Sequence, residues 1–194
     1  MKNILLILLI FTSIQAYSQQ QVYPLHAEGD DFPNNSYFKD LDGELDPYIG
    51  VWKGNWNGKT VYLELRKVKY YLGTTPTNGT YQDMVVGERK IINSDGTISI
   101  DRISNFDEVN SEFYGISSQF KNPAQKYITF SPKNMCGITA SLDLTFLDTA
   151  KTQMSLHFIP NPKFIDESCS YYNSMLQGVE LPMNFPKDIV LTKQ

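Results

Sequence analysis

Residues 50–59 read GVWKGNWNGK, and this stretch decides the fold that the sequence predicts. The pair Asn57-Gly58 lies between two stretches of alternating apolar residues. Such a pair favours a type I′ hairpin, because both central residues of that turn need a positive φ angle. On the return stretch, residues 60–66, one face carries the apolar side chains Val61, Leu63 and Leu65. We therefore expect an antiparallel hairpin here.

Trp52 lies between Gly50 and Gly54 at two-residue steps, so one face of the opening strand carries a tryptophan framed by glycines. Glycine inside a strand often marks a bend or a close approach of other groups. A tryptophan placed in this way can lie across the end of a barrel and seal it with roughly 200 Å² of apolar surface. The alternative is that Trp52 belongs to the core of an ordinary β-sandwich.

Regular alternation continues along the chain. It is clearest in residues 138–146, ITASLDLTF, where every second side chain is apolar, and it recurs in residues 152–158, TQMSLHF. Short strands at this spacing predict an all-β fold, an antiparallel up-and-down β-barrel of about 8–10 strands, with a β-sandwich as the alternative. The barrel is favoured because a closed wall leaves no open strand edge.

The opening strand resembles that of known barrels. Gly50-x-Trp52 resembles the G-x-W signature on the first strand of lipocalins and related calycins. With Gly54 it also resembles the G-x-W-x-G-x-G start of nitrobindin-type haem barrels, in which Trp56 here replaces the third glycine. The lipocalin T-D-Y motif is absent, and the final strand offers Lys193 but no arginine to stack on the tryptophan. The resemblance implies a lipocalin-like barrel.

The chain as a whole resembles an uncharacterised family of small secreted bacterial domains. The segments that carry this resemblance are the start Asp46-x-Tyr48-x-Gly50-x-Trp52-x-Gly54, the hairpin Asn57-Gly58-Lys59-Thr60 and the run Gly87-Glu88-Arg89-Lys90. The resemblance covers most of the chain after its leader. It implies export but brings no assigned activity.

Residues 1–18 are predicted to be a signal peptide. Lys2 precedes an apolar run at residues 4–11, and residues 16–18, AYS, supply small side chains where a signal peptidase reads. The apolar run is too short and too close to the start to be a good membrane span. We expect cleavage after Ser18 and a secreted or periplasmic protein that does not span a membrane. Since no cysteine follows the run, a lipid anchor is not expected.

Residues 19–46 are predicted to be an acidic, irregular lead-in, and residues 47–194 a single β-barrel domain. Acidic side chains alternate around Gly43 with a spacing similar to that of a calcium loop, namely Asp40, Asp42, Glu44 and Asp46. The EF-hand pattern is not met and flanking helices are not evident. We therefore favour a solvated acidic segment and predict no metal site.

Charge and cysteine content narrow the classes of partner and compartment. The formal net charge is -4, and loss of the leader with its Lys2 moves it to about -5. No basic run occurs, which argues against a nucleic-acid partner. Cys136 and Cys169 are the two cysteines, and in an exported chain we expect them to form a disulfide. Two buried free thiols or a pair of metal ligands are the alternatives.

Motifs that carry catalysis are not found. The sequence has no phosphate-binding loop, dinucleotide fingerprint, nucleophile elbow or zinc-binding helix motif. His157 falls on the polar face of a predicted strand, where it is expected at the surface rather than as a haem ligand. Glu64, Glu88 and Asp143 are expected on polar strand faces as solvated charges. We expect no enzymatic activity and no cofactor, although a pair of glycosidase carboxylates stays open.

Aromatic residues are the strongest hint of binding, with 12 tyrosines and 11 phenylalanines. Inward rings could line a cavity, outward rings could stack on sugars or on a partner protein, and rings that merely fill the barrel are the alternative. The residues expected to bind a ligand or to seal the barrel are Trp52, Trp56, Tyr62, Tyr71 and Phe146.

Two functions follow as hypotheses. The first is an exported, non-enzymatic, lipocalin-like domain that binds a small apolar or amphipathic ligand inside the barrel. The second is a cell-envelope protein-interaction module without a ligand. A haem-binding barrel and a hydrolase are weaker alternatives.

Overall fold

The computed structural model describes residues 20–29, 31–75, 77–118, 125–133, 135–161, 167–179 and 183–194. The predicted signal peptide, residues 1–18, lies outside them. The strands are β1 (Val22–Pro24), β2 (Tyr37–Lys39), β3 (Gly50–Trp56), β4 (Lys59–Gly73), β5 (Gly79–Ile92), β6 (Ile98–Asp101), β7 (Phe113–Ser118), β8 (Lys126–Phe130), β9 (Ala140–Phe146), β10 (Gln153–Pro160) and β11 (Asp188–Lys193). Short helices occur at η1 (Asp46–Tyr48), η2 (Ile103–Asn105) and α2 (Tyr172–Leu176).

The chain forms two compact units. The barrel unit comprises Asp42–Val68 and Met84–Gln194, and the hairpin unit comprises Met1–Leu41 and Lys69–Asp83. This division passes through two strands, and the expected boundary between residues 46 and 47 stays a prediction. The reason is the length of β4 and β5, which have 15 and 14 residues and therefore contribute to both units. Their distal ends join the segment that was expected to be an irregular lead-in.

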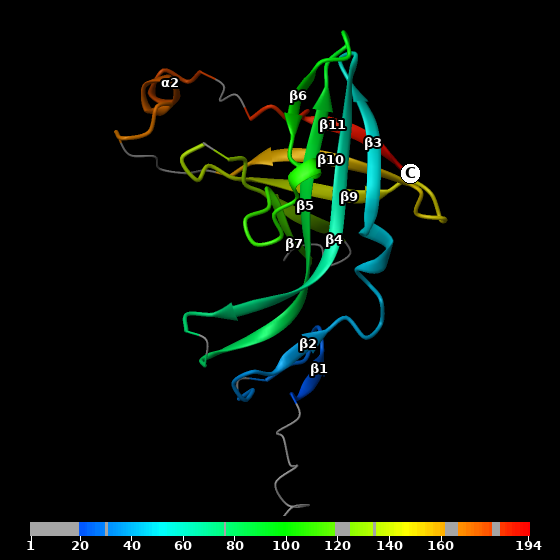
Figure 1. The fold of residues 1–194 in the computed structure, drawn as a ribbon, viewed down its shortest axis with the longest axis vertical. Coiled ribbons are helices and arrows are strands. Elements are labelled where there is room, and N and C mark those ends of the chain that lie inside the picture. Colours follow the sequence, from blue (N-terminus) through cyan, green and yellow to red (C-terminus); the bar gives the residue numbers. More distant parts are fainter. Residues whose placement is uncertain are drawn as a thin grey trace, which may run out of the picture. The chain divides into compact units, whose positions relative to one another are not determined.

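The barrel unit is a closed barrel of eight antiparallel strands, in the order β3-β4-β5-β7-β8-β9-β10-β11 (Figure 1). Each of these strands pairs with the next along the chain, except that β6 pairs with β5 beside this path. One seam closes where β11 pairs with β3, with Leu191 opposite Gly54. The other closes where β5 pairs with β7, with Val86 opposite Tyr114. The barrel predicted from the sequence is confirmed, and the sandwich is not formed.

The opening hairpin forms as the sequence indicates. Asn57 and Gly58 have φ angles of 49° and 79°, as the predicted turn requires. Gly54 is needed for a different reason, because a Cβ atom there would lie 2.6 Å from Leu191 Cδ2 and 2.7 Å from the Val190 carbonyl oxygen. The missing side chain thus lets the last strand approach the first.

Trp52 is buried in the barrel unit beside the seam between β3 and β11. Its side chain is fully buried, and its indole Nε1 donates a hydrogen bond of 2.7 Å to the carbonyl oxygen of Tyr48. The Lys193 ammonium lies 5.3 Å from the centre of the indole ring and donates to the carbonyl oxygen of Pro47. Phe146 packs nearby, with its ring centre 6.3 Å from that of Trp52. The lysine of the final strand therefore covers the tryptophan, where the sequence offers no arginine.

The hairpin unit contains β1 and β2, drawn in blue in Figure 1, so residues 19–46 are not wholly irregular. β1 runs parallel to β2, and β2 runs parallel to β5 with Tyr37 opposite Tyr81. Three rings pack on one side of these strands, since Phe38 lies 4.8 Å from Phe32 and 5.8 Å from Tyr23 between ring centres. Aromatic packing orders a segment that its acidic composition describes as a loop.

Replacement of Trp52 by alanine is expected to lower the free energy of unfolding by about 3–5 kcal/mol, because it empties a fully buried position. Trp56→Ala is the matched control, since Trp56 is only half-buried, and should cost about 1 kcal/mol. Urea unfolding followed by circular dichroism measures both. Equal losses in the two variants would contradict the difference in burial between Trp52 and Trp56.

Candidate functional site

The interior of the barrel is filled by its own side chains. The inward residues with less than 2% exposure include Trp52, Leu63, Leu65, Ile91, Phe113, Ile128, Phe130, Leu142, Met154, Leu156 and Leu191. A cavity that could admit even a water molecule would leave accessible area on the side chains that line it. These residues have almost none, and the rings of Phe113 and Phe130 stack with centres 4.6 Å apart. Among these described residues the barrel core is therefore closely packed, as protein interiors generally are.

A buried ion pair closes the end of the barrel opposite Trp52. Arg89 and Glu112 have side chains 4% and 3% exposed, and Arg89 Nε donates to Glu112 Oε2 over 2.8 Å. The guanidinium lies 4.8 Å from the ring centre of Phe130. Phe130 pairs with Ala140, the first residue of β9, whereas Phe146 beside Trp52 is the last. Burial lowers the pKa of Arg89, and the neighbouring carboxylate of Glu112 opposes this effect.

Glu88 is fully buried, so the prediction that it would be a solvated charge is wrong. It lies next to Arg89 on β5 and therefore faces the opposite side of the strand. There Arg102 covers it with two hydrogen bonds, of 2.9 Å and 3.0 Å, to the two carboxylate oxygens. Burial raises the pKa of Glu88, and the hydrogen bonds from Arg102 act in the opposite direction. This geometry is that of a structural ion pair.

The predicted disulfide between Cys136 and Cys169 is present and holds a cap on the barrel unit. We call residues 135–138, 167–179 and 183–185 the cap. An apolar cluster surrounds the disulfide, made of Met135, Ile138, Tyr171, Tyr172, Met175 and Met183. The cap is tied to the barrel because Arg89 Nη1 donates to the carbonyl oxygens of Met183 and Asn184.

Neither a metal-binding cluster nor a membrane-spanning helix occurs in the part of the chain that the structure describes. Among the described residues no group of three or more histidine, cysteine, aspartate or glutamate side chains could hold a metal ion. His157 lies on the outer face of β10, half exposed, with its Nδ1 atom 2.5 Å from Asp188 Oδ1. Within the described ranges, none of the helices has the length and apolar character needed to cross a bilayer.

Of the five residues expected to bind a ligand or to seal the barrel, the structure brings two together. Trp52 and Phe146 lie side by side in the barrel unit. Trp56 lies at the end of β3, with the Lys59 ammonium 5.3 Å from its ring centre. Tyr62 alternates with the buried residues of β4 and lies under Lys53 on the outer face. Tyr71 belongs to the hairpin unit.

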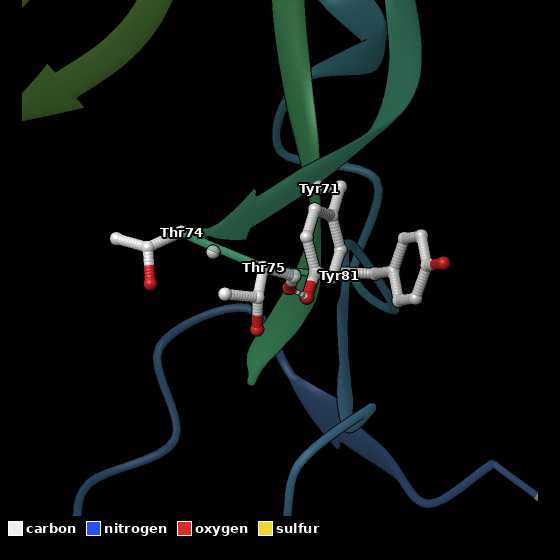
Figure 2. A pocket seen from close by; sticks show the side chains of 5 residues that line it. Tyr71, Thr74, Thr75 and Tyr81 are labelled. Carbon is white, nitrogen blue, oxygen red and sulfur yellow. Dashed lines mark hydrogen bonds between the residues drawn. The ribbon is translucent and has the colours of Figure 1, made fainter. Parts of the chain in front are cut away.

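Tyr71 lines a pocket at the turn between β4 and β5, which we call the hairpin pocket (Figure 2). Its volume is about 320 Å³, at the lower end of the range for small-molecule sites. The described residues that line it are Tyr71, Gly73, Thr74, Thr75 and Tyr81. The described residues of the turn, 73–75 and 77–78, are exposed, so the pocket opens directly to solvent.

The ring of Tyr71 is held in place on several sides. A Cβ atom on Gly73 would lie 2.7 Å from this ring, and one on Gly79 would lie 2.8 Å from it, so the two glycines make room for it. The Tyr71 hydroxyl donates to the carbonyl oxygen of Thr75, as Figure 2 shows. The ring of Tyr81 stands 5.1 Å away between centres, inclined by 56°. The pocket is therefore formed before any ligand arrives.

Further tyrosine contacts continue along the same strand faces. The Lys69 ammonium lies 4.3 Å from the ring centre of Tyr37 and 4.5 Å from that of Tyr81. The hydroxyl of Tyr37 donates to Asp83 Oδ1, and the backbone N–H of Asp40 donates to Asp83 Oδ2 over 2.9 Å. These contacts fix Tyr81 and the β2–β5 pairing behind the hairpin pocket.

Three lining side chains were not singled out from the sequence, namely Thr74, Thr75 and Tyr81. The available signal was the turn composition around Asn78-Gly79, which marks a loop between two strands. It does not show that the strands on both sides extend far enough to bring Tyr81 against Tyr71. The contact between Tyr81 and Tyr71 depends on the pairing register of β4 and β5, which the sequence does not give.

Replacement of Glu112 by glutamine is expected to lower the free energy of unfolding by about 3–5 kcal/mol, because it leaves the charge of Arg89 buried without a partner. Glu64→Gln is the matched control, since the Glu64–Arg66 pair is partly exposed, and should cost about 0–1 kcal/mol. Urea unfolding near neutral pH compares them. Equal costs would contradict the structural role of the Arg89–Glu112 pair.

Loss of the disulfide through the double change Cys136→Ser and Cys169→Ser is expected to cost about 3–4 kcal/mol, because the reduced unfolded chain is less constrained. Thermal unfolding with and without reductant provides the same comparison in the unaltered protein. An unchanged free energy of unfolding after loss of the disulfide would contradict the stabilising role of the Cys136–Cys169 bond.

Comparison with known proteins gives a family but no activity. No curated protein matches the chain, and no solved structure matches it. One family model matches over residues 1–194, and its description is a family of unknown function. A match over the full sequence, on a chain that folds as an eight-stranded barrel with a hairpin unit, places this protein in the family of unknown function DUF6705.

Proposed function

We propose that this protein is an exported, non-enzymatic binding domain whose ligand site is the hairpin pocket. The observation that carries the proposal is the preformed position of Tyr71, fixed by two glycines and by its hydrogen bond to Thr75. A ring held in this way loses little conformational entropy when a ligand stacks on it, which favours binding. The sequence predicts a small apolar or amphipathic ligand inside the barrel. We propose a small amphipathic ligand as well, but in the hairpin pocket.

The close packing of the barrel core favours the hairpin pocket over the barrel interior as the ligand site. Binding of a ligand among the inward residues would require several fully buried side chains, such as Phe113 and Met154, to move apart. Such repacking of a dense core is costly. The hairpin pocket needs no repacking. An interior ligand stays a prediction from the sequence, and the packing weighs against it.

The lining of the pocket supports binding rather than catalysis. Tyr71 and Tyr81 supply ring faces, and Thr74 and Thr75 supply hydroxyl groups. These groups hold and orient a ligand that has an apolar side and polar substituents. A threonine nucleophile needs an adjacent base, and the commonest general bases are histidine, carboxylate and lysine side chains. None of the five described lining residues is of this kind.

The disulfide supports export, because disulfides persist in oxidising compartments outside the cytoplasm. The leader predicted at residues 1–18 agrees with this, although it lies outside the described residues.

An NMR titration with n-octyl β-glucoside, kept below its micelle concentration, tests the site. This probe combines an apolar chain with a hydroxylated head. We expect chemical-shift changes at the backbone amides of Thr74, Thr75 and Tyr81, lost in Tyr71→Ala. Tyr62→Ala is the matched control, since Tyr62 lies on the outer face of the barrel unit, and should bind as the unaltered protein does.

Two outcomes would contradict the proposal. Shift changes at the methyl groups of Leu142 and Met154 would indicate a ligand inside the barrel. The absence of changes anywhere in the protein would indicate that no amphipathic ligand binds at the concentrations used.

A further inference from the structure

We infer that the natural ligand of the hairpin pocket is a neutral glycan chain, one sugar ring of which rests on Tyr71 and Tyr81. This inference rests on the proposed function and adds the chemical class of the ligand. It follows from the ring faces, the hydroxyl groups, the charge and the openness of the pocket.

The two tyrosine rings form a platform of the right kind for a sugar. Their centres are 5.1 Å apart and their planes are inclined by 56°, so the two rings contact each other in a tilted arrangement and leave no slot between them. Figure 2 shows the Tyr71 hydroxyl turned to Thr75, while the Tyr81 hydroxyl points away from Thr75. A pyranose ring carries C–H groups on its faces and hydroxyls at its edge. The C–H face can lie on an aromatic ring while the edge stays free for hydrogen bonds.

The threonines supply the partners for that edge. The Thr74 hydroxyl donates to Asn78 Oδ1 over 3.1 Å, which leaves its oxygen free to accept a hydrogen bond from a sugar hydroxyl. The Thr75 hydroxyl has a long contact of 3.5 Å with the Thr77 hydroxyl, which a closer ligand group could replace. Sugar hydroxyls both donate and accept, so they match side chains that do the same.

Charge decides between neutral and ionised glycans. The five described lining residues are all uncharged, so an ionised ligand would leave water without an opposite charge from the pocket wall. The nearest described cation on the same face of β4, Lys69, is already engaged by the rings of Tyr37 and Tyr81 and by Gln20 Oε1. A neutral ligand meets no such cost.

The openness of the pocket decides between a free sugar and a chain. Leu72, Gly73, Thr74 and Thr75 are all exposed, so the pocket covers one side of a ligand and leaves the other in solvent. A free monosaccharide bound in this way would bury little surface. A chain can extend past the turn in both directions, with one of its rings on the platform.

The test uses NMR titrations of the full exported protein with neutral hexasaccharides, namely cellohexaose, maltohexaose, laminarihexaose and N-acetylchitohexaose. Hexagalacturonate serves as the ionised comparison. We expect at least one neutral hexasaccharide to shift the amides of Thr74, Thr75 and Tyr81. Hexagalacturonate should bind at least tenfold more weakly.

Variants separate the contributions to the site. Tyr71→Ala should weaken binding at least tenfold, whereas Tyr71→Phe keeps the ring and should retain most of the affinity. Thr74→Val keeps the shape of the side chain and removes its oxygen, so it should weaken binding several-fold with the hairpin intact. Thr74→Val keeps the test valid if Tyr71→Ala disturbs the hairpin.

The outcomes distinguish this inference from the proposed function. Binding of n-octyl β-glucoside at the pocket without binding of any neutral hexasaccharide would overturn the glycan and leave the proposed function standing. Tighter binding of hexagalacturonate than of every neutral hexasaccharide would overturn the neutral class. Failure of every probe would overturn both.

Discussion

The barrel depends on the close approach of its first and last strands. Gly54 allows this approach, because any side chain there would collide with Leu191 and with the backbone of Val190. Closure then places Lys193 over Trp52, so this contact forms only when the seam forms. The contact joins segments at opposite ends of the barrel sequence. Contacts of such long range make folding slow, because the closing loop is ordered before the contact is gained.

Much of the barrel could be predicted from the sequence, because its signals are local. The turn at Asn57-Gly58 and the alternation of β9 and β10 depend on neighbouring residues, and both appear as expected. The hairpin unit could not be predicted, because the pairing of Tyr37 with Tyr81 joins two short segments far apart in the chain. Propensity and composition carry no information about such a contact.

The candidate site shows the same limit. Tyr71 could be singled out as an aromatic residue on a strand, but its partner Tyr81 and its support by Gly73 and Gly79 depend on the register of a hairpin with a long arm. Glu88 was expected to be solvated because its strand alternates. Its burial comes from Arg102, which lies beyond the next strand and was not expected to cover it. Side-chain periodicity shows which face a residue occupies but not what lies over that face.

The two buried ion pairs on β5 have a consequence for strand alignment. Glu88 and Arg89 are neighbours that face opposite sides of the strand, and each meets a residue of opposite charge, Arg102 on one side and Glu112 on the other. A slip of β5 by one position would exchange the two faces. It would then set arginine against arginine outside and glutamate against glutamate inside, so misaligned forms of the barrel are penalised on both sides of the wall at once.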